Sequence, residues 1–211
     1  TRVDWSKIFG AHSLDVTGGF RYTNFNFDSS SIAGANSGSD NSFNVSTNLD
    51  HLSSDGDKNV WTNMAWYLSA DYSYKTRYFL QLAASLETSS RFGSNADGAL
   101  KLGGVAWGLF PSVQAGWLIS SEPWFKVSWI DMLKLKASNG SQGNDNISDY
   151  LYTDMYSITN SDGEISIKRS SIGNENITWE TNTNFNAGID FEVLGGRISG
   201  TAEYFYRKTS D

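Results

Sequence analysis

The chain has 211 residues and no cysteine, which excludes disulfides and thiolate metal sites. Its net charge of -7 at pH 7 argues against nucleic acid as a partner, because phosphate binding requires clustered Lys and Arg. Gly, Asn, Ser, Thr and Tyr dominate while helix formers are sparse, so an all-β fold is predicted. No apolar run approaches the roughly 20 residues of a membrane helix, but this does not exclude the strands of a membrane barrel, in which only every second residue faces lipid.

The first predicted strands lie near the N-terminus. Residues 2–9 alternate weakly between apolar and polar side chains, and Gly10 begins a short turn. Residues 12–26 alternate clearly, and side chains two residues apart share one face of a strand. The apolar face of this second strand carries Leu14, Val16, Gly18, Phe20 and Tyr22. Residues 28–58, rich in Ser, Asn, Gly and Asp, predict a long loop.

Two strands of membrane length follow. Residues 60–74 and 77–88 each alternate strictly, and Lys75 and Thr76 turn the chain between them. Strands in soluble sheets are typically about 5 to 6 residues long, whereas a tilted membrane strand needs roughly 9 to 11. The length of both stretches therefore favours a membrane barrel.

The middle of the chain is mixed. It predicts two further strands, at 109–117 and 132–139, and two loops, at 89–107 and 141–177. Residues 119–131 show no strand pattern, and Pro123 is placed to open a helical turn there.

The last predicted element is a long hairpin over residues 178–207, turning at Gly195 and Gly196. One face of its first strand is apolar, and the other carries Asn, Asp and Glu with few Lys. Such a polar face suits a wet, enclosed lumen.

Turns and aromatic residues point to the same architecture. Short turns at Gly10, Lys75 and Gly195 alternate with long loops that begin near Ser29, Ser89 and Ser141. Outer-membrane barrels have short periplasmic turns, long extracellular loops and aromatic girdles near the strand ends. The fold class predicted is therefore all-β, an antiparallel transmembrane β-barrel portion of about eight strands.

Five ordered motifs resemble the SusC/RagA-like family of TonB-dependent outer-membrane transporters. They are Tyr72-Ser73-Tyr74-Lys75-Thr76-Arg77-Tyr78, Ser89-Ser90-Arg91-Phe92-Gly93, Phe110-Pro111-Ser112 with Gly116-Trp117 and Ser121-Glu122, Leu133-Lys134-Leu135-Lys136-Ala137-Ser138 ending in Gly140-Ser141-Gln142-Gly143-Asn144, and Trp179-Glu180-Thr181 running on to Asn186, Gly188, Asp190-Phe191 and Arg197. Glu87-Thr88, Lys136 and Asn139 depart from the family's usual Asp-Gly, Arg and Tyr.

The resemblance implies a middle portion of a barrel of about 22 strands. Residues 1–211 would then be a partial barrel domain, an internal segment that lacks the plug domain, the TonB-contacting segment and the remaining strands. It also implies import of glycans or oligopeptides in the outer membrane of a Gram-negative, Bacteroidota-type bacterium. Expected partners are a SusD-like surface lipoprotein, the protein's own plug, the TonB complex and outer-membrane lipid.

Two groups of residues are candidates for contact with substrate or plug. Aromatic residues in the predicted extracellular loops offer faces for stacking on a sugar or packing against a peptide, although packing against the plug or a neighbouring loop is the favoured explanation for them: Phe92, Trp107, Tyr150, Tyr152 and Tyr156. Charged residues on the polar faces are expected to line the lumen: Arg21, Asp71, Arg77, Lys134, Lys136, Glu180, Asp190, Arg197 and Glu203.

Catalysis and cofactors are not predicted. The two histidines, His12 and His51, lie on different elements and form no nucleophile or metal constellation. Asp55-Gly56-Asp57 does not match the spacing of a calcium loop. We expect no enzyme activity, no cofactor and no metal.

Two alternative folds fit parts of the pattern. A soluble all-β carbohydrate-binding or adhesin-like module would pack its long strands as two sheets around one core. A complete barrel of about eight strands would require the first and last strands to pair. The position of the apolar faces distinguishes the soluble module from a membrane barrel.

Overall fold

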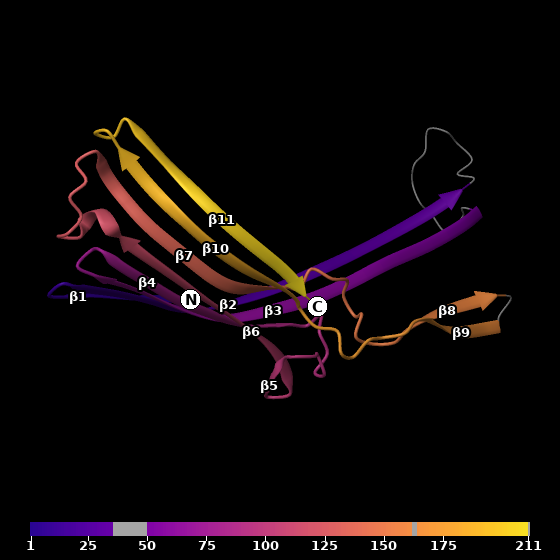
Figure 1. The fold of residues 1–211 in the computed structure, drawn as a ribbon. Coiled ribbons are helices and arrows are strands. Elements are labelled where there is room, and N and C mark those ends of the chain that lie inside the picture. The colour runs from indigo at the N-terminus through magenta and orange to yellow at the C-terminus, as the bar shows by residue number, and fades with distance from the viewer. Residues whose placement is uncertain (36–49, 162–163, 211) are drawn as a thin grey trace.

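A computed structural model describes residues 1–35, 50–161 and 164–210. It is dominated by one curved antiparallel sheet (Figure 1). The main strands are β1 (Arg2–Phe9), β2 (His12–Ala35), β3 (Asp50–Tyr74), β4 (Tyr78–Ser89), β6 (Val105–Leu118), β7 (Ile130–Asn144), β10 (Glu180–Val193) and β11 (Ile198–Ser210). Smaller elements are β5 (Leu100–Leu102), the 3-10 turn η1 (Ile119–Ser121), β8 (Met155–Ser161) and β9 (Glu164–Ser171).

Strand order follows chain order. The sheet runs β1-β2-β3-β4-β6-β7-β10-β11, with β5 paired to the start of β6 and with β8 and β9 as a separate hairpin. The prediction of an all-β chain with about eight barrel strands is confirmed. In the described part of the chain β1 and β11 are the edges of the sheet and do not pair with each other, so a closed eight-stranded barrel is not formed.

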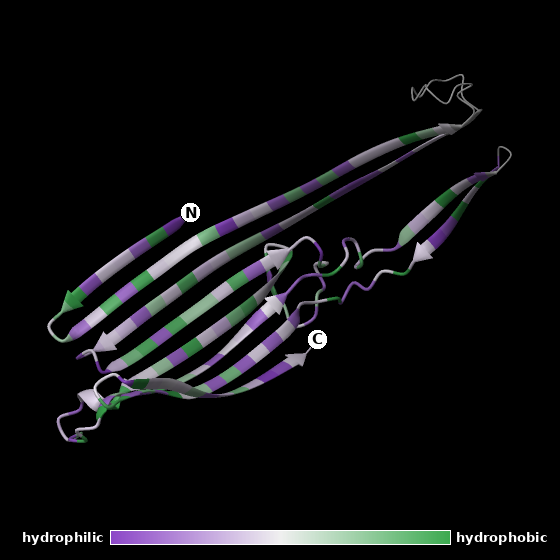
Figure 2. Cartoon of the chain, turned by 90° about the horizontal axis from the view of Figure 1, so that it is seen from above, coloured by the Kyte–Doolittle hydropathy of each residue, from purple (hydrophilic) through white to green (hydrophobic). Residues whose placement is uncertain are grey.

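Cross-strand register keeps apolar and polar residues on opposite faces. Directly paired residues share a face, and one row across five strands is Leu80, Ala115, Ala137, Ala187 and Tyr204. The row one residue along is Gln81, Gln114, Ser138, Asn186 and Phe205. Figure 2 shows the resulting alternation of hydrophobic and hydrophilic positions along the strands.

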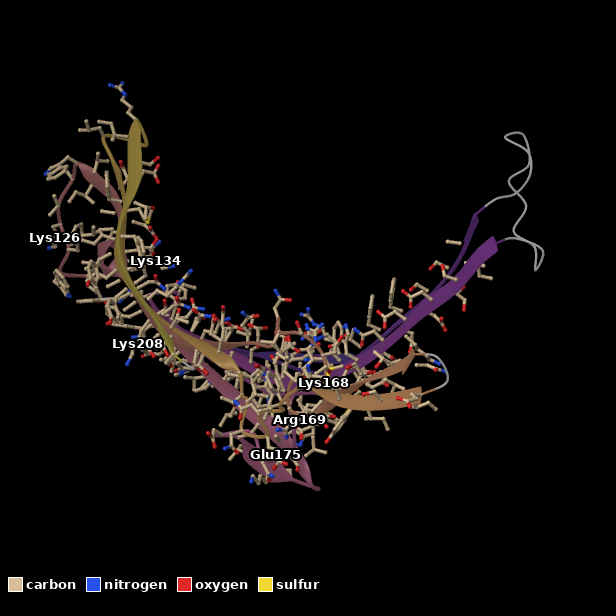
Figure 3. All side chains as sticks on the ribbon, turned by 90° about the vertical axis from the view of Figure 1, so that its right-hand side faces the viewer. Lys126, Lys134, Lys168, Arg169, Glu175 and Lys208 are labelled. Atoms are coloured by element: carbon tan, nitrogen blue, oxygen red, sulfur yellow. The ribbon has the colours of Figure 1, made fainter. Side chains whose placement is uncertain are left out.

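The polar face is the concave one. Figure 3 shows the sheet bent into a trough, with Lys134 on its inner side and Lys208 on its outer side. Lys134 lies directly opposite Asp190 in the β7–β10 register, so it belongs to the polar face. Lys208 lies on the same face of β11 as Tyr204 and Tyr206, which is the apolar face. The curvature therefore encloses the polar side chains and displays the apolar ones outward.

The outward apolar side chains have no second layer to cover them. Trp66, Leu68 and Leu82 are each at least half exposed on the convex face. Among the described residues the buried hydrophobic side chains are few, and all but Ala65 belong to one small cluster where the loops meet β6. A soluble two-sheet module would instead bury these faces in a common core, so that alternative is wrong for this fold. No helix within the described residues is long and apolar enough to span a membrane.

The two ends of the sheet differ. At one end, called here the short-turn rim, tight connections follow β1, β3 and β10, with left-handed backbone at Gly10, Lys75, Thr76, Gly195 and Gly196. The connection between β6 and β7, residues 119–129, lies at the same rim but is longer and contains η1. The predicted helical turn is thus present, but it precedes Pro123 instead of starting at it.

The opposite end, called the long-loop rim, contains more strand than predicted. β2 and β3 continue as a paired ribbon well into the predicted loop 28–58, as the long arms in Figure 1 show. β5 and the β8–β9 hairpin lie within the other two predicted loops. These predictions were wrong because Ser, Asn and Gly, although typical of loops, can also pair in a ladder when a partner strand is held beside them.

The assignment of the two faces predicts that a charged side chain destabilises the wall on the convex face and not on the concave face. Leu82 lies in the middle of the outward residues of β4 that pair with β6, and Gln81 beside it points into the trough. In the full protein in phospholipid vesicles, Leu82→Arg should lower the free energy of unfolding by about 2–4 kcal/mol, because the guanidinium would lie in hydrocarbon. Gln81→Arg is the matched control and should cost little. Equal losses, measured by denaturant unfolding, would contradict the assignment of the two faces.

Candidate transport wall and its two rims

A shallow groove crosses the concave face. It has a volume of about 560 Å³ and spans β3 to β11. The strands position its lining because each contributes every second residue to the trough. The lining includes Tyr67, Phe110, Gln114, Ser138, Asn184, Asn186, Phe205 and Arg207.

The groove combines aromatic rings with neutral hydrogen-bonding groups. Asn186 Nδ2 donates to Ser138 Oγ at 3.2 Å, and Arg207 Nε donates to Asn184 Oδ1 at 2.8 Å. Arg207 is the one charged residue among the described lining residues. The groove can therefore accept hydroxyl and amide groups while offering ring faces for packing.

Charges gather on the concave face nearer the short-turn rim. Lys136 Nζ lies 3.0 Å from Asp190 Oδ1 and 4.0 Å from Glu203 Oε1, and Thr201 donates a hydrogen bond to the same Asp190 oxygen at 2.8 Å. Lys134 Nζ lies 4.8 Å from the centre of the Phe79 ring. Both signs of charge are thus paired within the wall, as a wet lumen allows.

The structure places the nine predicted lumen residues in two groups. Arg77 and Arg197 lie in turns of the short-turn rim and not in strands. The other seven have cross-strand partners on the concave face: Arg21, Asp71, Lys134, Lys136, Glu180, Asp190 and Glu203. Sequence reasoning missed the groove itself, although Tyr67 and Phe205 gave a signal, since each is an aromatic residue in a polar row.

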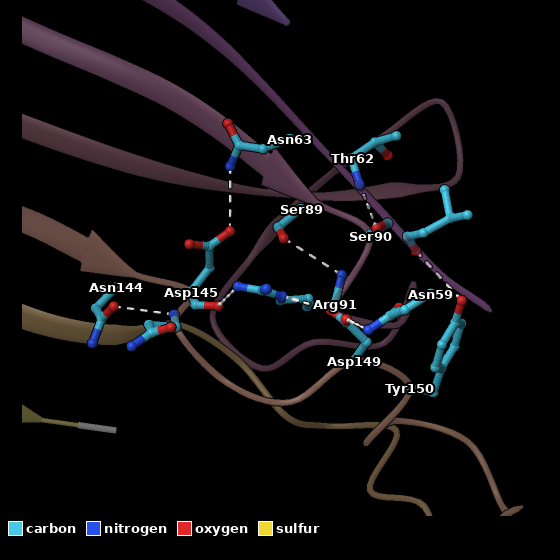
Figure 4. A network of polar contacts seen from close by, with 12 residues as sticks. Asn59, Thr62, Asn63, Ser89, Ser90, Arg91, Asn144, Asp145, Asp149 and Tyr150 are labelled. Carbon is cyan, nitrogen blue, oxygen red and sulfur yellow. Dashed lines mark hydrogen bonds and ion pairs between the residues drawn. The ribbon is translucent and has the colours of Figure 1, made fainter. Parts of the chain in front are cut away.

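A polar network closes the long-loop rim (Figure 4). Arg91 Nε donates to Asp149 Oδ1 at 2.7 Å, and Arg91 Nη1 donates to the carbonyl oxygen of Asp145 at 3.0 Å. The guanidinium lies 4.5 Å from the centre of the Trp61 ring, and Asn59 also donates to Asp149. One side chain thereby ties the loop after β4 to the loop after β7 and to β3.

Beneath this network the loops have a small core. Phe92, Ala96, Ala106, Phe110 and Trp179 are buried together, and the Phe92 and Trp179 ring centres are 4.3 Å apart. Phe110 also lies over Gly143, where a Cβ would come within 2.2 Å of the ring. The loop residues therefore hold one another in place.

The five loop aromatics do not form one surface. Phe92 is only 7% exposed, so it packs the loops and offers no ring face to a substrate in this arrangement. Tyr152 packs beside Gly93, and Trp107 lies in the β5–β6 hairpin, where its indole N–H donates to the carbonyl oxygen of Leu102. Tyr150 is exposed, and its hydroxyl donates to the carbonyl oxygen of Val60 in β3. Tyr156 is exposed on β8.

Glu122 organises the short-turn rim. Its carboxylate is buried and accepts hydrogen bonds from the Tyr78 hydroxyl at 2.6 Å and the Trp117 indole N–H at 3.0 Å, with Arg77 Nη1 at 3.4 Å. These hydrogen bonds, from Tyr78 first, hold the pKa of Glu122 below its usual value. The longer connection is thus fixed to the ends of β4 and β6.

Within the described residues, no group of three or more His, Cys, Asp or Glu side chains is arranged to hold a metal ion. His12 lies at the short-turn rim, where its Nδ1 is 2.7 Å from the Tyr72 hydroxyl. The side chain of His51 lies outside the described part of the chain. The expectation of no enzyme activity and no cofactor stays a prediction.

An open antiparallel wall with an apolar convex face, a polar concave face and two unlike rims defines a segment of a transmembrane β-barrel. Residues 1–211 match the family model described as TonB dependent receptor-like, beta-barrel. The chain therefore belongs to this family of TonB-dependent receptors.

Individual relatives agree with the family. The chain is 34% identical over 159 residues to the TonB-dependent receptor SusC of Bacteroides thetaiotaomicron, covering 71% of this chain and 15% of that protein. It is 26% identical over 218 residues to the TonB-dependent receptor P3 of Formosa agariphila, covering 99% and 21%. The fold matches the structure of the RagAB peptide importer in the closed-closed state with a TM-score of 0.83 at 20% identity, covering 100% and 23%. The chain thus spans less than a quarter of each of these relatives.

The contacts of Arg91 are expected to stabilise the loops of the long-loop rim. Arg91→Lys keeps the charge but loses the forked contacts to Asp149 and Asp145, and hydrogen bonds to charged groups contribute about 1.5–3 kcal/mol each. Limited proteolysis of the folded protein, followed by intact mass, should show cleavage in residues 90–99 or 145–154 about tenfold faster or more. Arg169→Lys alters a half-exposed pair with Asp154 and is the control. No change for Arg91→Lys would contradict the role of the network.

The lowered pKa of Glu122 is expected to make the stability of the folded protein depend on pH. Because the folded state lowers the pKa of Glu122 from an ordinary value of 4.5, its contribution to stability is complete above that value and is lost as pH falls through the folded-state pKa. Glu122→Gln should lower the thermal midpoint at about pH 7 and reduce its further fall towards about pH 3. Glu164→Gln, on the exposed β9 strand, is the control. Parallel pH profiles for Glu122→Gln and the wild type would refute the assignment.

Proposed function

We propose that this chain forms part of the barrel wall of a TonB-dependent importer in the outer membrane of a Bacteroidota-type Gram-negative bacterium. The observation that carries the proposal is the two-faced wall, apolar towards lipid and polar towards a trough whose groove is lined mainly by uncharged groups. Family membership and the SusC and RagAB likenesses support it. The plug, the TonB-contacting segment and the remaining strands would belong to other parts of the full protein.

The proposed cargo is a glycan or an oligopeptide, captured with a SusD-like surface lipoprotein at the long-loop rim. The neutral amide, hydroxyl and aromatic groups of the groove suit either cargo. The exposed Tyr150 and Tyr156 stand at the rim where cargo would enter, together with Tyr152 and Trp107. The charged concave residues nearer the short-turn rim, Lys134, Lys136, Asp190 and Glu203, would face cargo or plug nearer the periplasm.

The importer proposal can be tested genetically. Deleting the gene should abolish growth on one class of glycan or peptide supplied as the sole nutrient, and the wild-type gene should restore it. Restoration should fail in a strain with a disrupted TonB complex. Mild detergent purification of the full protein should also recover a surface lipoprotein, identified by mass spectrometry. Growth that is unaffected by loss of either the gene or TonB would refute the proposal.

If Tyr150 contacts the cargo, removing its ring should reduce uptake. Tyr150→Ala should reduce uptake of the labelled nutrient roughly threefold to tenfold, because one ring contact contributes about 0.5–1.5 kcal/mol beyond its buried area. Tyr204→Ala removes the same side chain from the lipid-facing side and should leave uptake unchanged at equal surface expression. Equal uptake by the wild type and Tyr150→Ala would exclude Tyr150 from the cargo path.

A further inference from the structure

The connection between β6 and β7, residues 119–129, differs from the other described turns of the short-turn rim because it displays two exposed tryptophans. Trp124 is 62% exposed and Trp129 is 57% exposed, and Val127 is also exposed. Exposed apolar groups of this kind mark an interaction site when they are contiguous.

These side chains are held, not loose. Glu122 fixes the start of the connection through Tyr78 and Trp117. At its end the Leu194 N–H donates to the carbonyl oxygen of Trp129 at 3.0 Å. Next to it, the Asp131 carboxylate accepts hydrogen bonds from the amides of Gly195 and Gly196 at 2.8 and 3.2 Å. A segment anchored at both ends therefore keeps its indole rings outside the protein.

The rings continue the lipid-facing surface of the wall. Along the short-turn rim each ring contacts the next, from Phe9 through His12, Tyr74, Tyr78, Trp117 and Trp124 to Phe125. The Trp117 and Trp124 ring centres are 6.2 Å apart. Since Trp117 ends the convex apolar row on β6, Trp124 extends that row beyond the strand. Figure 3 shows Lys126 on the outer side of the trough as well.

We propose that residues 119–129 form a phospholipid-binding foot on the periplasmic leaflet, in which Trp124, Val127 and Trp129 enter the headgroup boundary and Lys126 binds the phosphate of an anionic headgroup. Indole rings favour this depth because one part is apolar and the N–H is polar. The ammonium complements the phosphate charge. The inference requires only that the convex face meets lipid and does not depend on what is imported.

The position of the foot can be measured by fluorescence quenching in the full protein, reconstituted in vesicles. Val127→Cys carries a bimane label, and Thr76→Cys in the β3–β4 turn of the same rim is the matched control. We expect nitroxide-labelled phospholipid to quench the label at 127 and aqueous iodide to quench the label at 76. Quenching of both labels by iodide alone would place residues 119–129 in water and overturn the proposal. A label at 127 protected from both quenchers would indicate a protein occupant and would overturn it too.

The headgroup contact has its own test in the same vesicles. Nitroxide-labelled phosphatidylglycerol should quench the label at 127 at a lower concentration than labelled phosphatidylcholine. Lys126→Gln should reduce the preference for phosphatidylglycerol over phosphatidylcholine about fivefold, which is the effect of one lysine near an anionic surface. Lys134→Gln, which removes the same charge from the concave side, should retain it. Equal quenching by the two lipids in the wild type would overturn the role of Lys126.

Discussion

A strand that crosses hydrocarbon must pair its backbone N–H and C=O groups with neighbouring strands, because lipid offers no hydrogen-bonding partner. This constraint accounts for the continuous antiparallel register from β1 to β11. Once that register is set, period two fixes which side chains meet lipid and which meet the trough. A slip of one residue would place Gln81 and Gln114 in hydrocarbon and Leu80 and Ala115 in the lumen.

Where the ladder ends, side chains take over the task of holding the chain. At the long-loop rim Arg91 bridges three segments that are distant in sequence, and the Phe92–Trp179 contact packs beneath it. At the short-turn rim Glu122 performs the same task with three donors. Both are single charged groups satisfied by several partners, which is the condition under which burying a charge is tolerated. The rims are therefore built by polar contacts, and the wall by backbone pairing.

The sequence predicts the wall well because alternation is a local property. Strands such as β4 and β10 can be recognised from their own residues, and so can the Gly195-Gly196 turn. The rims could not be predicted in the same way, since Arg91 and Asp149 are far apart in the chain and nothing local links them. Extension of β2 to Ala35 depends on its partner in β3, and the groove depends on residues from β3 to β11, Tyr67 and Phe205 among them, sharing one concave face. Local pattern identified the faces, while long-range contacts determined the sites.

The departures from the family motifs become intelligible on this wall. Lys136, where Arg is usual, still reaches both Asp190 and Glu203, so the charge pairing survives although the planar fork of Arg does not. Asn139, where Tyr is usual, lies on the convex face between Val113 and Phe185, towards the long-loop rim. An amide is tolerated there because the cost of a polar group falls towards the membrane boundary. Thr88, the second residue of the departing pair, is buried opposite Met64, where a side chain continues the ladder that Gly would weaken. Each substitution therefore preserves the face to which its residue belongs, which is the property the register requires.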